Sequence, residues 1–330
     1  MRTLKRLLLI ISSITILLIG WFYLHIHSNI KLPTATYELS IQPSSNLKQI
    51  SQQLANAGII PSQWTFIILA RYLNHESAIK AGDYELTGNL SQIALLDYLI
   101  KGNAKQNEIK FIEGWTFAQM RKVLNEHPAI EYKSAGLSDQ QILQHIGASE
   151  TAVEGIFFPD TYYFIKGSSD LDILQRAYKT MQNHLQNYWS ERVESLPLNT
   201  PYEALILASI IEKETGAESD RAEIAGVFIN RLRKGMKLQT DPTVIYGLGE
   251  QFDGNLRKKD LLADQEYNTY TRAGLPPTPI SLPSLASIRA ALNPAETDAL
   301  YFVAKGNGES EFSTNLADHN KAVNKYQKQQ

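Results

Sequence analysis

The chain has 330 residues, a formal net charge of −2 and no cysteine. Its length exceeds the commonest single-domain size, so we expect two soluble modules with appended segments, and its charge gives no reason to expect a nucleic-acid partner. The absence of cysteine excludes thiol catalysis, disulfides and thiolate zinc sites, and the scattered histidines have no metal-ligand spacing, so we expect no metal and no cofactor.

The chain opens with an uncharged apolar stretch, residues 7–24 (LLLIISSITILLIGWFYL), at the short end of what spans a bilayer as a helix. Arg2, Lys5 and Arg6 precede it, so the positive-inside rule places residues 1–6 in the cytoplasm and the rest of the chain outside. A cleaved signal peptide is the competing interpretation. Because no small-x-small cleavage site follows, we expect an uncleaved single-pass anchor in the cytoplasmic membrane.

Residues 36–105 show the order of elements that is typical of a small α+β module. We expect, in chain order, a strand at 37–41, helices at 47–57 and 63–73, a turn and strand within 80–89, and a helix at 91–100. The pattern alone favours a spacer that holds the following residues away from the membrane. Glycan binding by this module is the alternative, and it is the more specific function.

The next part of the chain is expected to be mostly helical with a little sheet. The predicted elements are a strand at 107–111, a helix from Thr116 to about residue 127, a helix at 139–146 and a long amphipathic helix at 170–191. Between them lies the aromatic stretch EGIFFPDTYYFIKG, residues 154–167. Such a cluster is more often core than a sugar subsite, so we expect core, with Asp160 and Tyr162 as weaker candidates for a cleft.

Residues 202–249 contain the candidate chemistry. Ala204–Ile211 is apolar on nearly every face, which predicts a buried helix. Glu212 and Glu214 fall in its last turn, because Gly216 stands just beyond. Residues two apart point about 200° apart, so at most one of the two acids can face a given cleft. Glu214 continues the stripe of Leu207, Ile210 and Ile211, whereas Glu212 continues that of Leu205 and Ala208.

A carboxylic acid on an apolar stripe at a helix C-terminus should have a raised pKa, because burial and the helix dipole both disfavour its charged form. A general acid near neutral pH needs such a pKa. From spacing alone, ordinary solvated carboxylates paired with Lys213 or Arg221 are the more expected alternative, since structural carboxylates outnumber catalytic ones.

After Gly216, Asp220 and Glu223 have the spacing of a capping box for a helix that Gly235 ends. We expect the following residues, 236–249, to form extended chain or a loop next to that helix. Gln239, Thr240 and Asp241 are its polar cluster. Asp241 is either a second carboxylate near Glu214 or a turn residue before Pro242.

The proline-rich segment that begins at Tyr267, YNTYTRAGLPP, suits a fixed loop over a cleft, with Asn268 and Tyr270 able to bind sugar hydroxyl and acetamido groups. A helix at 284–292, a strand at 300–304 and a last helix after Asn315 complete the chain. His319 precedes or enters that last helix, and a structural hydrogen bond is its expected role.

Four runs carry a resemblance to a known family: ASIIEKETG (208–216), VFINRLRKGMKLQTDPTVIYGLG (227–249), YNTYTRAGLPPTPIS (267–281) and NLADHNKAV (315–323). They closely resemble the YceG/MltG-like family of membrane-anchored endolytic murein transglycosylases. The resemblance implies an α+β fold with a LysM-like module at 36–105 and a catalytic domain at 106–330. It makes Glu214 the essential acid. The substrate-binding candidates are Gln239, Thr240, Asp241, Tyr246, Asn268 and Tyr270.

The implied reaction is cleavage of the MurNAc-GlcNAc bond within peptidoglycan strands, which leaves 1,6-anhydroMurNAc ends. The implied partners are glycan strands and synthases of the penicillin-binding class. A hydrolytic muramidase is an alternative, and it would need Asp241, Glu212 or another acid to position water. A membrane-anchored peptidoglycan-binding scaffold is another alternative, although it would not need the E-K-E-T element.

Overall fold

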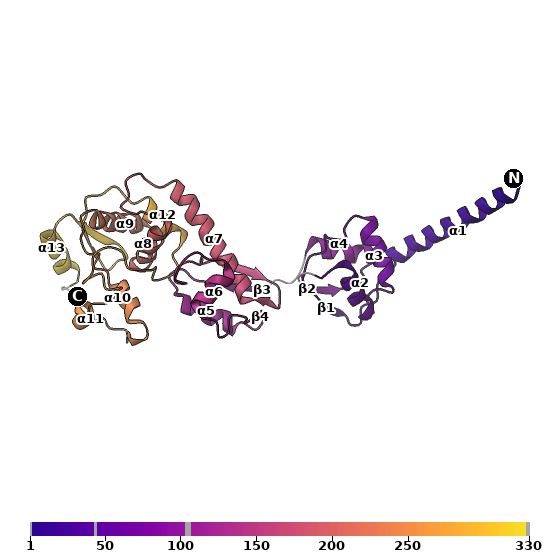
Figure 1. Ribbon diagram of the computed structural model, residues 1–330, viewed down its shortest axis with the longest axis horizontal. Helices are drawn as coiled ribbons and strands as arrows, with labels where there is room; N and C mark the ends of the chain where they lie inside the picture. The colour runs from indigo at the N-terminus through magenta and orange to yellow at the C-terminus, as the bar shows by residue number, and fades with distance from the viewer. Residues whose placement is uncertain (1, 43–44, 103–106, 328–330) are drawn as a thin grey trace. The chain divides into compact units, whose positions relative to one another are not determined.

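The computed structural model describes residues 2–42, 45–102 and 107–327, which divide into two compact units (Figure 1). The first unit extends to Asn107 and includes Tyr163–Gly167, and the second contains Glu108–Tyr162 and the chain from Ser168 onward. Helices and small sheets occur in both, so the α+β prediction is confirmed. Residue 1 of the expected cytoplasmic tail and residues 105 and 106, the expected module boundary, lie outside the described residues.

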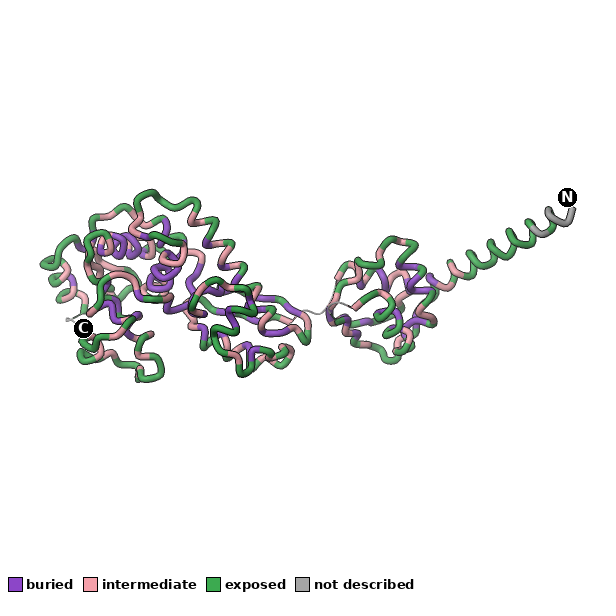
Figure 2. The backbone as a smooth tube through the Cα atoms, viewed as in Figure 1, coloured by how far each residue is buried: buried purple, intermediate pink, exposed green. Residues whose placement is uncertain are grey.

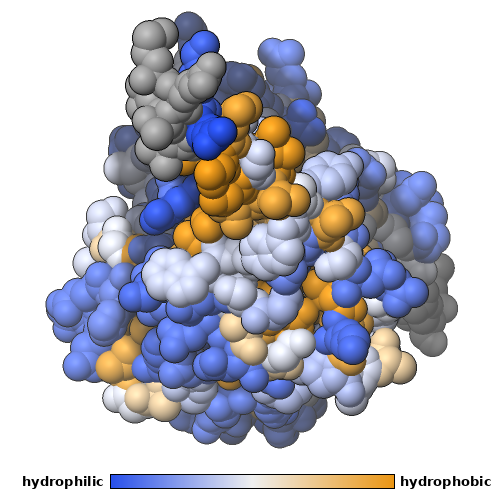
Figure 3. Space-filling view, turned by 90° about the vertical axis from the view of Figure 1, so that its right-hand side faces the viewer, coloured by the Kyte–Doolittle hydropathy of each residue, from blue (hydrophilic) through white to orange (hydrophobic). Residues whose placement is uncertain are grey.

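Helix α1, Arg2–His27, contains the predicted apolar stretch. Its residues Leu8–His27 have a mean hydropathy of 2.0, and no other helix of the described chain is long and apolar enough to cross a membrane. Figure 3 shows hydrophobic side chains of this helix at the surface. Its C-terminal end is different, because Ile26 and the nearby Ile30 are buried in the core of the first unit. The Gln92 amide also donates a hydrogen bond to the His25 carbonyl, 3.3 Å away.

The remaining elements of the first unit match the predicted order. They are β1 Thr36–Ile41, α2 Leu47–Asn56, α3 Gln63–Tyr72, β2 Gly82–Thr87 and α4 Gln92–Lys101. Strands β1 and β2 are antiparallel, with Thr36 opposite Thr87 and Ile41 opposite Gly82. Alternate side chains of this two-stranded sheet, such as Leu39 and Leu86, are buried against the helices. The alternation of apolar residues therefore fixes which face of the sheet forms the core.

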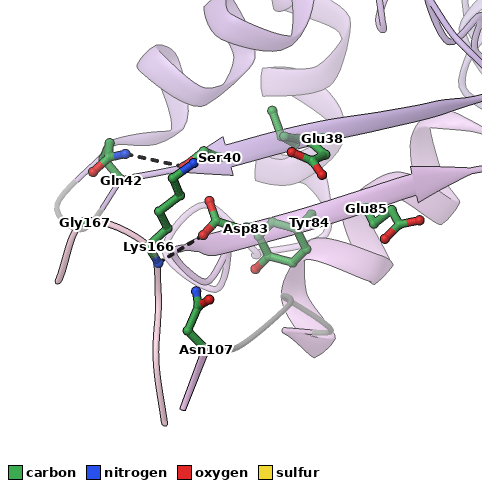
Figure 4. Close-up of a pocket in the computed structure, with 10 residues that line it drawn as sticks. Glu38, Ser40, Gln42, Asp83, Tyr84, Glu85, Asn107, Lys166 and Gly167 are labelled. Atoms are coloured by element: carbon green, nitrogen blue, oxygen red, sulfur yellow. Dashed lines mark hydrogen bonds between the residues drawn. The ribbon is translucent and has the colours of Figure 1, made fainter. Parts of the chain in front are cut away.

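A cavity of about 560 Å³ lies at one end of this two-stranded sheet. Figure 4 shows the residues that line it. The carboxylates of Glu38, Asp83 and Glu85 lie around it, and the Lys166 backbone N–H donates to Asp83 Oδ2 at 3.0 Å. That bond attaches the segment Tyr163–Gly167 to the first unit. Among the described residues that line this cavity, none is a predicted site residue.

The second unit is mostly helical. Its elements are β3 Asn107–Lys110, α5 Phe117–Glu126, β4 Ile130–Glu131, α6 Asp139–Ile146, β5 Thr161–Phe164, β6 Ser168–Ser169, α7 Asp170–Ser190, α8 Pro201–Glu214, α9 Glu218–Arg233, α10 Asp241–Leu248, the 3-10 turn η1 Gly249–Gln251, α11 Lys258–Leu262, α12 Leu285–Leu292, β7 Tyr301–Ala304, β8 Ser310–Ser313 and α13 Leu316–Tyr326. The sheets are two-stranded: β3 pairs with β5, β4 with β6 and β7 with β8.

Helix α8 is the centre of the second unit. All residues from Ala204 to Ile211 are buried, and α8 contacts α7, α9, α10 and α12 (Figure 2). Thr200 caps its N-terminus by accepting the Glu203 N–H at 3.2 Å, and Pro201 occupies the first turn, where a missing N–H is tolerated. The prediction of a buried helix is confirmed, and the amphipathic helix α7 packs beside it.

The aromatic stretch at 154–167 is core, as expected. Phe157, Tyr162 and Phe164 are buried, and the Tyr162 hydroxyl donates to the Phe158 carbonyl at 2.8 Å. Asp160 is exposed and accepts the Thr161 N–H at 2.7 Å. Neither Asp160 nor Tyr162 therefore lines the candidate cleft described below.

The prediction of extended chain or loop over residues 236–249 is wrong in its second half, because Asp241–Leu248 is helix α10. The β-branched residues suggested extended chain, and Pro242 suggested a break. Proline is tolerated in the first turn of a helix, and Pro242 stands there. Tertiary contact with α8 then decides the conformation of this segment over its weak local preference.

The capping box predicted at Asp220 and Glu223 is also wrong. Helix α9 begins earlier, at Glu218, and its N-cap residue, Ala217, makes no side-chain capping bond. Asp220 consequently lies inside the first turn, is buried and accepts the Ser219 hydroxyl at 3.0 Å.

Gly226 is required where α9 packs closely against the chain before β7. A Cβ at this position would lie 2.7 Å from Thr297 Cγ2 and 2.8 Å from the Ala295 carbonyl oxygen. We expect Gly226→Ala to lower the free energy of unfolding by about 1–3 kcal/mol, the usual cost of overpacking. Chemical denaturation monitored by circular dichroism measures this. Gly216→Ala is the control, since a Cβ there meets nothing within 4 Å. Equal stability of the two variants would contradict the prediction.

Candidate active site

The two acids at the end of α8 have different surroundings. Glu212 points to the N-terminus of α12, where its Oε2 accepts the Ser284 N–H at 2.9 Å, the Ser284 hydroxyl at 2.5 Å and the Ser287 hydroxyl at 2.7 Å. Three donors on one oxygen stabilise the start of α12, so Glu212 has a structural role. Glu214 is the acid that faces a cleft.

The cleft at Glu214 has a volume of about 460 Å³. Its polar lining comes from six elements and the chain next to them: Glu214, Arg231, Gln239, Asp241, Tyr270, Tyr301, Ser310, His319 and Gln327. Of the predicted site residues, the structure thus gathers Glu214, Gln239, Asp241 and Tyr270 around one space. Thr240 belongs to the same site, because its hydroxyl donates a hydrogen bond to Glu214 Oε1.

The pKa of Glu214 is raised from 4.5 to about 7. Burial is the main cause, and the negative charge of Asp241 adds to it. The Thr240 hydroxyl and the Arg231 guanidinium oppose this rise, because both favour the carboxylate. The side chain can therefore give and take a proton near neutral pH, as the apolar stripe predicted.

Thr240 is held by its backbone. It is the N-cap residue of α10, yet its hydroxyl contacts Glu214 and caps nothing. Its N–H donates to Thr269 Oγ1 at 3.1 Å, and its carbonyl accepts the Thr243 hydroxyl at 2.8 Å. Gln239 before it has a left-handed φ of 51°, a conformation that is uncommon outside glycine. These constraints direct the Thr240 hydroxyl toward the acid.

Arg231 forms one wall of the cleft. Its Nε donates to the Leu300 carbonyl at 2.7 Å and its Nη1 to the Leu238 carbonyl at 2.8 Å, so the guanidinium is fixed. It lies 5.0 Å from the centre of the Tyr301 ring, and Tyr301 stacks on His319 with ring centres 5.1 Å apart. His319 Nδ1 is buried with no hydrogen-bond partner in the described chain. Nδ1 therefore does not make the expected structural hydrogen bond, and the His319 ring contacts the cleft wall by stacking on Tyr301.

Asp241 and Tyr270 form a hydrogen-bonded pair in the same cleft. The Tyr270 hydroxyl donates to Asp241 Oδ1 at 2.5 Å, and the Tyr270 N–H donates to Asn268 Oδ1 at 2.9 Å. Burial and the Asp241 carboxylate raise the pKa of Tyr270, so its hydroxyl stays protonated at neutral pH. Asp241 itself is exposed at the N-terminal turn of α10.

Two predicted binding residues lie elsewhere. Asn268 is fully buried, and its amide donates to the carbonyls of Asp260, Leu261 and Ala263 at 2.7–3.2 Å, so it holds a loop together. Tyr246 lies in a second cavity, where its hydroxyl donates to Glu154 Oε2 at 3.2 Å. The structure does not bring either side chain to the Glu214 cleft.

Two residues of these sites were not singled out from the sequence. Burial raises the pKa of Glu154 to about 7, and its Oε1 accepts the Phe117 N–H at 2.9 Å. Arg231 follows the apolar positions Val227 and Phe228 at helical spacing, which could have placed it on the inward face of α9. Among the described residues, no three His, Asp or Glu side chains converge as metal ligands would.

The fold and the site together define a protein with a titratable carboxylic acid at the end of a buried helix, facing a polar cleft. Comparison places it in a family: the chain matches the YceG-like family over residues 39–325, and it belongs to that family. It is 33% identical over 309 residues to a Bacillus subtilis protein named endolytic murein transglycosylase, covering 88% of this chain and 85% of the relative.

Further similarities extend over most of the chain. A Streptococcus pneumoniae protein of the same name is 28% identical over 319 residues, which cover 86% of this chain and 57% of that longer relative. A crystal structure of a YceG-like protein from Listeria monocytogenes is similar with a TM-score of 0.56 and 30% identity, covering 87% of this chain and 98% of the other.

The raised pKa of Glu214 has a consequence for stability. Between pH 4.5 and 7 the native side chain keeps a proton that the unfolded chain has released, so this acid makes the protein less stable as pH rises. We expect Glu214→Gln to be more stable than the wild type at pH 8, by on the order of 2 kcal/mol, with the gain disappearing by pH 4.5. Thermal unfolding across this range measures it. A gain that is the same at both ends of the range would contradict the raised pKa.

Proposed function

We propose that this protein is a membrane-anchored endolytic lytic transglycosylase that cuts peptidoglycan strands at the MurNAc-GlcNAc bond. The observation that carries the proposal is Glu214, one titratable acid that faces a cleft at the end of a buried helix, with a pKa of about 7. Family membership and the names of the similar proteins support the choice of substrate. Because Glu212 is occupied by α12, it does not compete for the role.

In the proposed mechanism, protonated Glu214 gives its proton to the glycosidic oxygen as the bond from C1 of MurNAc breaks, and GlcNAc leaves with a free 4-hydroxyl. The resulting Glu214 carboxylate then takes the proton from the C6 hydroxyl of the same MurNAc. The C6 oxygen attacks C1 and closes the 1,6-anhydro ring. The carboxyl returns to its starting protonation state, and no water is consumed.

An intramolecular nucleophile suits a cleft with one free acid. The C6 hydroxyl is part of the substrate, so its effective concentration replaces a second catalytic carboxylate. Asp241 is the other carboxylate of the cleft, and one of its oxygens accepts the short bond from Tyr270. A hydrolytic muramidase, which would need Asp241 to position water, is the second candidate for this reason.

We propose that Thr240 sets the proton affinity of Glu214, and that Gln239, Tyr270 and Arg231 bind polar groups of the two sugars. Arg231 and Tyr270 are held by bonds to backbone or to Asp241, so they need little rearrangement to bind a substrate. Fixed donors around the acid would orient the MurNAc ring for attack by its own C6 oxygen.

The anchor proposal rests on α1. If residues 7–24 were a signal peptide removed soon after residue 24, Ile26 and Ile30 would lie at a new N-terminus, although both are buried in the core of the first unit. The Gln92 bond to the His25 carbonyl supports the same continuity. We therefore propose an uncleaved anchor in the cytoplasmic membrane, with the chain after α1 on the extracytoplasmic side.

The first unit, residues 36–105 by our proposal, would act as a LysM-like module that binds glycan or as a spacer. An enzyme held at the membrane meets glycan strands while they are being polymerised. Early cuts would limit the length of nascent strands, and synthases of the penicillin-binding class would be its neighbours. These roles follow from the proposed reaction and from the anchor.

Product analysis tests the reaction. Purified glycan strands are incubated with the full-length protein in detergent, and the new ends are identified by mass spectrometry. We expect 1,6-anhydroMurNAc ends from the wild type and none from Glu214→Gln. Reducing MurNAc ends would instead make the protein a hydrolase and move attention to Asp241. Binding of strands without any cleavage would support a scaffold.

Thr240 provides a test of the acid's role. Its hydroxyl stabilises the Glu214 carboxylate, so Thr240→Val should raise the pKa of Glu214 and move the alkaline limit of kcat/KM up by roughly one pH unit. Thr240→Ser keeps the hydroxyl and is the matched control, with an expected limit near that of the wild type. If the valine and serine variants lose activity at the same pH, the alkaline limit does not report Glu214.

A further inference from the structure

The second unit has a cavity of about 860 Å³, and two of its lining residues are adjacent in sequence to residues that line the Glu214 cleft. Lys213 and Pro242 line this cavity, whereas their neighbours Glu214 and Asp241 line the cleft. The C-terminal end of α8 and the first turn of α10 therefore contribute to both spaces.

The cavity has a rigid aromatic wall. The rings of Tyr246 and Tyr267 meet edge to face, with centres 4.9 Å apart and an angle of 62°. The Tyr246 hydroxyl donates to Glu154 at 3.2 Å, and the Tyr267 hydroxyl shares a hydrogen bond with Thr278 Oγ1 at 2.8 Å. Both rings remain partly exposed. Since the hydroxyl of each phenol is hydrogen-bonded, both rings are held in place at the wall of the cavity.

Glu154, which the proposed mechanism does not use, is the buried anchor of this wall. One oxygen accepts the Phe117 N–H and the other the Tyr246 hydroxyl. Gly155 fixes its position: φ is +75°, and a Cβ there would lie 2.2 Å from Pro279 Cβ. The backbone next to Glu154 is thus closely packed. Glu154 in turn holds the Tyr246 ring in place through the hydrogen bond from the Tyr246 hydroxyl.

The lining of the cavity combines apolar surface, neutral polar groups and the charged side chains of Lys213 and Glu250. Ile245, Ile280 and Pro242 supply the apolar part, and Thr116 and Gln119 supply hydroxyl and amide groups. The Lys213 ammonium is engaged by the Gly114 carbonyl at 3.1 Å. The apolar surface beside hydroxyl and amide groups suits a ligand with flat apolar faces and polar edges, as sugar rings have, and the volume is that of a typical ligand site.

We propose that this cavity binds sugars of the same glycan strand, beyond those held at the scissile bond, with pyranose faces on Tyr246 and Tyr267. The inference rests on the proposed function, because an enzyme that cuts within a strand must accommodate sugars on both sides of the cut. It assigns Tyr246 to binding of distant sugars, away from the reacting atoms.

Binding without turnover tests this directly. Full-length protein carrying Glu214→Gln is titrated with peptide-free strands, a tetrasaccharide and a decasaccharide. Adding Tyr267→Ala should weaken decasaccharide binding roughly tenfold and change tetrasaccharide binding by less than about twofold. Tyr267→Leu, which keeps an apolar side chain, should behave alike if loss of the ring is responsible. Trp189→Ala is the control, because that ring carries Arg192 at 4.0 Å instead, and it should change neither affinity.

Kinetics with Glu214 intact separate binding from chemistry. Tyr267→Ala should raise KM for long strands roughly tenfold and leave kcat within about twofold of the wild type. Equal losses at both strand lengths, or a loss confined to kcat, would overturn the proposal. A loss seen only with peptide-bearing strands would overturn it too, by making the cavity a stem-peptide site. If the wild type cuts nothing, the proposed reaction fails, while the length-dependent binding still decides the role of the cavity.

Discussion

The cost of placing a carboxylic acid at the end of a buried helix is the constraint on which the candidate active site depends. Helix α8 contacts four other helices, so Glu214 at its end is poorly hydrated. Burial therefore raises the pKa of Glu214 to about 7. The surrounding chain moderates this cost without removing it: the Thr240 hydroxyl and Arg231 favour the carboxylate. The acid is thereby poised between two protonation states, which an acid/base mechanism requires.

Two glutamates in one helical turn show how helix geometry divides structural and chemical work. Their side chains leave α8 on different sides, so Glu212 accepts the donors at the start of α12 and Glu214 faces the cleft. Thr240 stands at the N-cap of α10, but its hydroxyl donates a hydrogen bond to Glu214. The Thr240 hydroxyl therefore does not cap α10, and it stabilises the Glu214 carboxylate at the end of α8 instead.

A second buried carboxyl, Glu154, lines the cavity to which Lys213 and Pro242 also contribute, and its environment is different. It accepts a backbone N–H and a phenol, so its hydrogen bonds position the Tyr246 ring. Burial raises the pKa of Glu154, and its bonds to the Phe117 N–H and the Tyr246 hydroxyl oppose that rise. Two carboxyls with similar pKa values can thus serve different purposes, and their hydrogen-bond partners distinguish them.

Hydrophobic periodicity predicted the apolar α1, the order of elements in the first unit and the burial of α8, and the angle between residues two apart on a helix predicted that at most one of Glu212 and Glu214 faces a given cleft. Only the tertiary structure decided that residues 241–248 are helical, that Asn268 holds a loop, and that Tyr246 lies with Glu154 away from the acid. Those outcomes depend on contacts between segments far apart in the chain, such as the bond that joins residues 154 and 246. Local propensity carries no information about such contacts.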